Sequence, residues 1–121
     1  MSLDLISVVN ASIPNKEFVL LQANTEMNLQ GYAIVDRTFN GQQVSNEFRH
    51  IFVFPNLDVA KGDFVKLFTG EDDYKNYKNE GGTYTHELFW QSSKCVWNDN
   101  GKDRASLIQY KHIGSADVKA M

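Results

Sequence analysis

The chain has 121 residues, of which 12 are Lys or Arg and 15 are Asp or Glu, so its formal net charge is −3. This length suits one domain, which we expect to span residues 1–121. Proteins that bind nucleic acid usually carry a basic surplus, because contacts with phosphates supply most of their affinity. The acidic balance therefore gives no reason to expect nucleic acid as a partner, and the single cysteine excludes an internal disulfide.

Hydrophobic residues make up 42% of the chain and charged residues 22%, which is typical of a folded globular domain. Residues 1–18 contain neither the basic segment nor the apolar segment of a secretion signal. No part of the sequence approaches the roughly 20 apolar residues that are needed to span a bilayer. We therefore expect a cytoplasmic protein without membrane insertion.

Short apolar or alternating runs, separated by turn residues, predict β-strands along most of the chain. In chain order these runs are 4–9, 17–23, 29–39, 42–54, 57–68, 87–93 and 104–111. Asn40-Gly41 is a strong hairpin signal because both turn positions require positive φ, and Gly62-Asp63 predicts a second turn. No window has a helical period. The pattern predicts an all-β fold, an antiparallel β-sandwich or barrel of about seven to nine strands.

The segment 70–85 breaks this pattern. It is rich in Lys, Asn, Asp, Glu, Gly and Tyr and has no clear period, which predicts a long polar loop. The segment 112–121 also has no strand pattern, and we expect it to be a loosely ordered tail. The folded core is then expected at about residues 5–111.

Three stretches occur in the order and spacing of the lamin-tail domain. They are EFVLLQANTEMNLQGYAIVDR from Glu17, FVFPNLDVAKGDFVKLF from Phe52, and LFWQSSKCVWNDNGKDRASLIQY from Leu88. The chain thus resembles a lamin-tail domain over residues 5–111, and this resemblance implies an immunoglobulin-like sandwich that acts as a non-catalytic interaction module. The sequence has no coiled-coil rod and no basic nuclear-localisation run, so a free-standing domain of bacterial type is the simpler inference.

The stretch from Cys95 to Tyr110 contains polar residues of the kind that surround bound calcium or form tight turns. The spacing excludes an EF-hand, because the acid expected five positions before the glycine is Val96. The resemblance implies that Trp97 is an inward-facing anchor near the end of a strand and that 98–101 form a turn. Ala105 and Leu107 would then face the core, with Ser106 and Ile108 on the opposite face.

The histidines give no pattern of a metal centre. His86-Glu87 begins like the zinc-protease motif, but the second histidine would fall at Trp90. His50 and His112 lie at no metal-ligand spacing from His86 or from each other. We interpret the three histidines as isolated strand or edge side chains and expect no cofactor and no metal.

A small hydrolase is the least favoured of three functional hypotheses. Its site would have to be assembled by the fold from His86, Glu87, Asp99 or Cys95, and the sequence nominates no base for a cysteine nucleophile. A buried thiol that behaves as a small apolar group is the simpler interpretation of Cys95. The chain is therefore not expected to be an enzyme.

The segment 70–85 is the best candidate for a binding site. Tyrosines among polar residues are typical of loops that contact partners, because tyrosine offers a large contact area at low entropic cost. We predict that a protein partner, or a second copy of the chain, binds through this loop or a sheet edge. The predicted partner-binding residues are Asp72, Asp73, Tyr74, Tyr77 and Tyr84.

Two alternatives concern other ligands of the same regions. Trp90 and Trp97 could stack on sugar rings, so a carbohydrate-binding module is the second hypothesis, although the resemblance implies that both lie near the core. The acids Glu71, Asp72 and Asp73 could bind a hard cation with main-chain carbonyls, but three adjacent acids in a polar loop are more often solvated.

Overall fold

The computed structural model describes residues 2–40, 43–97 and 103–120. In these ranges nearly all regular structure is β, as predicted, apart from a 3-10 turn, η1, at Pro14–Lys16. The strands are β1 (Leu3–Val9), β2 (Phe18–Ala23), β3 (Met27–Asn28), β4 (Tyr32–Asn40), β5 (Gln43–Val53), β6 (Asp58–Val59), β7 (Phe64–Phe68), β8 (Lys75–Lys78), β9 (Tyr84–Phe89) and β10 (Asp103–Gln109). The described ranges thus contain ten strands, slightly more than predicted, because two-residue strands such as β3 and β6 leave no alternating pattern.

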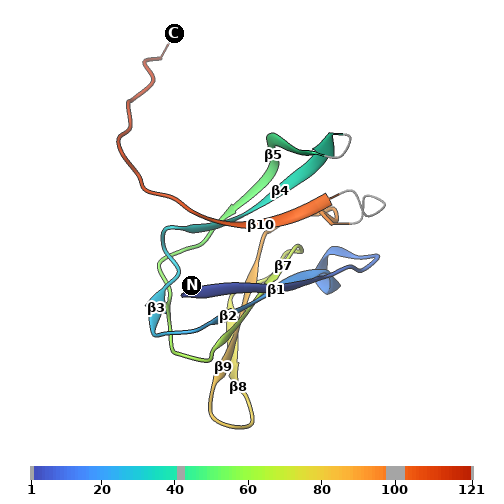
Figure 1. The fold of residues 1–121 in the computed structure, drawn as a ribbon, viewed down its shortest axis with the longest axis vertical. Coiled ribbons are helices and arrows are strands. Elements are labelled where there is room, and N and C mark those ends of the chain that lie inside the picture. Colours follow the sequence, from blue (N-terminus) through green and yellow to red (C-terminus); the bar gives the residue numbers. More distant parts are fainter. Residues whose placement is uncertain (1, 41–42, 98–102, 121) are drawn as a thin grey trace.

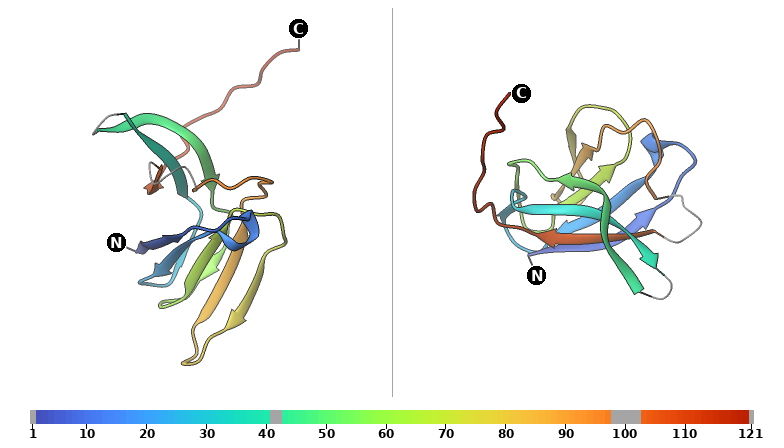
Figure 2. Two further views of the ribbon diagram at one scale, coloured as in Figure 1. Left: turned by 90° about the vertical axis from the view of Figure 1, so that its right-hand side faces the viewer. Right: turned by 90° about the horizontal axis from the view of Figure 1, so that it is seen from above.

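The strands form two main layers. One sheet has the order β1-β2-β7-β9-β8 and the other has the order β10-β4-β5, while β3 and β6 pair with each other. The three-stranded sheet lies over one face of the larger sheet, and the β8–β9 hairpin projects at the far end of the molecule (Figures 1 and 2). The predicted all-β sandwich is therefore confirmed.

One strand pair departs from the expected antiparallel arrangement. β7 and β9 are parallel, with Phe64 opposite Thr85 and Phe68 opposite Phe89. After β7 the chain passes to the sheet edge, forms β8 and returns as β9 between β7 and β8. The edge strand β8 is antiparallel to β9 and therefore runs opposite to both β9 and β7.

The core lies between the two layers. Its buried apolar residues come from both main sheets, from β6 and from the segments that follow β3, β5 and β9: Leu3, Val19, Leu21, Ala23, Leu29, Ile34, Phe54, Val59, Val65, Leu67, Leu88, Val96 and Trp97. Burying such side chains is the main favourable term in folding. Ala105 and Leu107 pack against this core, as predicted.

Trp97 is 4% exposed, so the prediction of an inward-facing anchor is confirmed. It lies in an irregular segment after β9 rather than near the end of a strand. The predicted turn at 98–101 and Gly41 of the predicted Asn40-Gly41 turn lie outside the described residues. At the other end of β10, residues 110–120 have no regular structure, are exposed, and extend away from the sandwich (Figure 1).

Candidate functional site

The segment 70–85, predicted as a long loop, forms a β-hairpin instead. β8 and the start of β9 pair in antiparallel register, with Tyr77 opposite Thr85. Asn79 closes the turn, since its N–H donates to the Thr83 carbonyl (2.7 Å) and its side-chain oxygen accepts from Thr85 Oγ1 (2.9 Å). All four β8 residues are exposed. The alternation that reveals a half-buried strand is therefore absent, which explains the wrong prediction.

The hairpin places the three predicted tyrosines on two faces. Tyr74 reaches His86, and Tyr84 shares the face of His86 because side chains alternate along a strand. Tyr77 pairs with Thr85 and therefore lies on the opposite face. The exposed fractions of Tyr74, Tyr77 and Tyr84 are 43%, 44% and 38%. The structure thus puts Tyr74 and Tyr84 on one face of the hairpin and Tyr77 on the other.

A chain of hydrogen bonds crosses the sheet from the interior to the edge strand. Asp63 Oδ2 lies 2.9 Å from His86 Nε2, His86 Nδ1 lies 2.8 Å from the Tyr74 hydroxyl, and Asn76 Nδ2 lies 3.0 Å from the same hydroxyl. Asp63 and His86 are buried, whereas Tyr74 and Asn76 are exposed. The Tyr74 and His86 rings are nearly parallel, at an interplanar angle of 17°.

One tautomer of His86 satisfies every group in this chain. With the proton on Nε2, the ring donates to Asp63, the Tyr74 hydroxyl donates to Nδ1, and the Asn76 amide donates to the Tyr74 oxygen. Each side chain then fixes the orientation of the next one. The edge strand is therefore connected to the buried carboxylate through side chains as well as through the sheet ladder.

Asp63 is the buried end of this chain. Its carboxylate accepts hydrogen bonds from the backbone N–H groups of Ala60 and Tyr84, both at 3.0 Å, in addition to His86. Burial raises the pKa of Asp63, but these three hydrogen bonds outweigh burial and leave the pKa below its usual value. Asp63 therefore joins the β6–β7 turn, β9 and, through His86, the edge strand.

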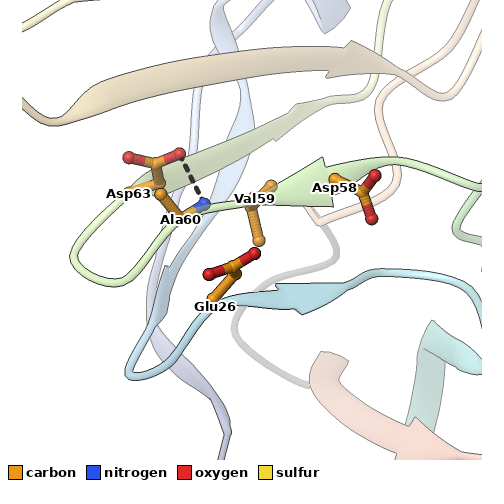
Figure 3. Close-up of a pocket in the computed structure, with 5 residues that line it drawn as sticks. All are labelled: Glu26, Asp58, Val59, Ala60 and Asp63. Carbon is orange, nitrogen blue, oxygen red and sulfur yellow. Dashed lines mark hydrogen bonds between the residues drawn. The ribbon is translucent and has the colours of Figure 1, made fainter.

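A pocket of about 280 Å³ borders this carboxylate (Figure 3). It is lined by Glu26, Asp58, Val59, Ala60 and Asp63. Its carboxylates do not converge on one point, since Asp63 is turned to the Ala60 N–H and Asp58 accepts from Asn28 Nδ2 at 2.9 Å. In the described ranges no three His, Cys, Asp or Glu side chains are grouped to hold a metal ion.

The predicted acidic residues stabilise the start of the hairpin. Asp72 accepts from Lys75 Nζ at 2.9 Å and from the Asp73 N–H at 2.7 Å. The bond from Lys75 lowers the pKa of Asp72, and the Asp72 carbonyl accepts from Gln91 Nε2 at 2.6 Å. Asp73 is exposed. Asp72 therefore has a local structural role, while Asp73 stays accessible to a partner.

The residues proposed for a hydrolase do not form one site. His86 and Glu87 are neighbours on β9 and so point to opposite faces. Cys95 donates to the Ala11 carbonyl at 3.6 Å, and its pKa is raised by burial and further by the Glu17 carboxylate, which keeps the thiol protonated. Asp99 lies outside the described residues. The hydrogen-bond partners of His86 are Asp63 and Tyr74 instead.

Two of the three histidines are not isolated, contrary to the prediction. Besides His86, His50 Nδ1 lies 2.9 Å from the buried Asp36 carboxylate, and its ring meets Trp90 edge-on. His112 is exposed in the segment after β10. Neither Asp–His pair is predictable from local spacing, because Asp63 precedes His86 by 23 residues and Asp36 precedes His50 by 14. The sequence pattern predicts Asp63 only as a turn residue.

The comparisons with known proteins add no relative. A scan against models of protein families finds no match to this chain, and a search of curated proteins finds none either. Within the described part of the chain, no helix is long and apolar enough to cross a membrane.

Proposed function

We propose that the chain is a non-catalytic interaction module, a lamin-tail-like sandwich that binds a protein partner by strand addition at β8. The observation that carries this proposal is that β8 is an exposed edge strand connected by side-chain hydrogen bonds to the buried residue Asp63. β8 pairs with β9 on one side and with no described strand on the other. An edge of this kind presents main-chain groups that a partner strand can pair with.

The side-chain contacts of the hairpin favour a binding edge over a mobile one. Ordering a flexible segment on binding costs free energy, so a pre-ordered strand binds more tightly. The chain from Asp63 through His86 to Tyr74 fixes one end of β8, and the Asn79 contacts fix the other. These bonds supply the order before a partner arrives.

Tyr74 and Tyr77 would contact alternate side chains of the added strand. They lie on opposite faces of the hairpin, at the positions where neighbouring residues of an extended peptide point up and down. Lys75 and Lys78 flank Tyr77 on the same short strand. Edge lysines oppose unselective strand pairing, so a partner would need side chains that complement both charges.

A matched pair of tyrosine variants tests this proposal. Tyr77 and Tyr110 are 44% and 40% exposed, but only Tyr77 lies on β8. With each variant as bait in a host lysate, Tyr77→Ala should reduce partner recovery at least tenfold, and Tyr110→Ala should leave it unchanged. A photo-crosslinking residue at 77 should label the same partner. Equal recovery with both variants, and no label from position 77, would contradict binding at β8.

A carbohydrate ligand is the second proposal, and it rests on different aromatic residues from those predicted. Trp97 is buried and Trp90 packs partly buried against the core, so neither offers a free ring face. Tyr74 and Tyr84, exposed on one face of the hairpin, are the better platform. Oligosaccharides should then shift the NMR signals of these two rings. Signals that stay unchanged across a broad panel of sugars would remove this alternative.

A further inference from the structure

The outer face of the five-stranded sheet, which points away from the three-stranded sheet, carries large apolar side chains on its central strands. In β7, Val65 and Leu67 are buried in the core, while Phe64 and Phe68 point the other way and are only half-buried. In β2, Phe18 likewise lies on the outer face. A sheet with one face in water normally alternates apolar and polar residues. Strands that are apolar on both faces indicate that both faces are covered.

Aromatic rings form a row across this face. Phe18 is opposite Phe68 in the register of β2 and β7, and Phe68 is opposite Phe89 in that of β7 and β9. The ring centroids of the two pairs are 5.0 and 5.3 Å apart, and the second pair is stacked. Val9 continues the row on β1. Contiguous exposed apolar groups of this kind mark interaction surfaces.

A second row, one pleat away, alternates in charge. Lys66 on β7 is opposite Glu87 on β9, and Glu87 is opposite Lys75 on β8. The ammonium groups of Lys66 and Lys75 lie 5.1 and 5.4 Å from the ring centroids of Phe18 and Phe89. The three-stranded sheet covers the opposite face (Figure 2). The outer face therefore presents a row of aromatic side chains beside a row of side chains whose charges alternate between positive, negative and positive.

We propose that this outer face binds the outer face of a second copy of the chain, about a two-fold axis that runs parallel to the strands between β7 and β9. This axis places β7 over β9 of the second copy. The aromatic rows of the two copies then face each other, and so do the charged rows. Lys66 then faces Glu87 of the second copy, and Phe68 faces Phe89. Aligned packing of this kind is a common way for two sheets to meet. The interface is self-complementary, as a two-fold dimer requires.

The charged row and the aromatic row together select this axis. An axis between β9 and β8 would pair Glu87 with Lys75 but would leave Lys66 and Phe68 beyond the edge of the second copy. An axis along β7 would place Lys66 against itself, and an axis along β9 would place Glu87 against itself. An axis perpendicular to the strands, along the charged row, would place both Lys66 and Glu87 against the same residues of the second copy. Only the axis between β7 and β9 pairs opposite charges at both positions and brings the aromatic rings together.

Charge reversal in trans tests the proposal. By light scattering and sedimentation velocity, the wild-type chain should form a dimer, and Lys66→Glu or Glu87→Lys alone should weaken it at least tenfold. Each single variant has like charges across the interface with itself and opposite charges with the other variant. A mixture of Lys66→Glu and Glu87→Lys should therefore form a heterodimer, and the double variant should dimerise again.

Two controls separate the interface from folding and from net charge. Lys61→Glu and Glu80→Lys make the same reversals at exposed positions off this face and should leave the dimer intact, and thermal unfolding should confirm that every variant folds. A wild-type chain that stays monomeric at millimolar concentration would overturn the proposal. A mixture of single variants that stays monomeric would overturn the axis and the interface built on it. The assay contains no partner protein, so its outcome is independent of binding at β8.

Discussion

Two buried carboxylates hold the two ends of β7, and they differ in where their contacts lead. Glu17 is fully buried, and its oxygens accept from Thr69 Oγ1 at 2.6 Å, from the Val96 N–H at 2.7 Å and from the Trp97 N–H at 3.3 Å. Asp63 is 5% exposed and also accepts three hydrogen bonds. A buried carboxylate needs such donors to offset its loss of hydration.

Glu17 and Asp63 differ in the chemical nature of one of their three hydrogen-bond donors. All three donors to Glu17 belong to neutral groups of the interior, and they fix the irregular segment that carries Trp97. One donor to Asp63 is a histidine, whose other ring nitrogen reaches an exposed tyrosine. Glu17 therefore acts only on the core, whereas Asp63 couples the interior to the edge strand. Substitutions at the two ends of β7 should separate these roles.

Replacing Glu17 should have the largest effect on stability. Glu17→Ala leaves the N–H groups of Val96 and Trp97 buried without an acceptor and opens a cavity, so the free energy of unfolding should fall by about 3 kcal/mol. Urea titration followed by tryptophan fluorescence measures the loss. Glu80→Ala, at an exposed turn position, is the control and should change stability by less than about 0.5 kcal/mol. Equal curves for the two variants would show that Glu17 is no anchor.

Replacing Asp63 should cost less and should depend on pH. Asp63→Asn keeps one acceptor oxygen but loses the charge, and we expect a loss of about 2 kcal/mol at pH 7. The folded pKa of Asp63 lies below the ordinary value of 3.8. The unfolded chain therefore takes up the proton first, and the stability that the carboxylate contributes is lost as pH falls below about 4. Urea midpoints of the two proteins should approach each other as pH falls below about 4, and a constant difference would contradict this.

The sequence pattern predicts strands that have one buried face, and it does not predict a strand that has none. Apolar or alternating runs predicted β2, β4, β7 and β10, because core packing requires apolar side chains at every second position, and the lamin-tail resemblance implied the inward direction of Leu107. β8 has no buried face, so its four polar residues resembled a loop. Glu17 and Asp63 were not identified as buried, because all their donors except Ala60 come from residues 21 to 80 positions away and no local spacing encodes them.

Removing the Tyr74 hydroxyl tests the exposed end of the chain of hydrogen bonds that runs from Asp63 through His86 to Tyr74. Tyr74→Phe keeps the ring and removes the hydrogen bonds to His86 and Asn76, so the loss should be about 1 kcal/mol. Hydrogen exchange should accelerate at the β8 and β9 amides but not at those of β4 and β10. Tyr84→Phe removes a hydroxyl from the same face without touching this chain and is the matched control. Faster exchange over the whole sandwich would instead indicate global destabilisation.

The reactivity of Cys95 tests the environment near Glu17, and replacing this cysteine should have little effect on stability. Its pKa is raised above its ordinary value of 9.0 by burial and further by the charge of the Glu17 carboxylate. Because only the thiolate reacts, the alkylation rate of the folded chain should still rise with pH where the rate of the urea-unfolded chain has levelled off. Cys95→Ser should shift the urea midpoint little. If the two rates level off at the same pH, neither burial nor the Glu17 carboxylate raises the pKa of the thiol, and the contrast between the two ends of β7 would then rest on their hydrogen bonds alone.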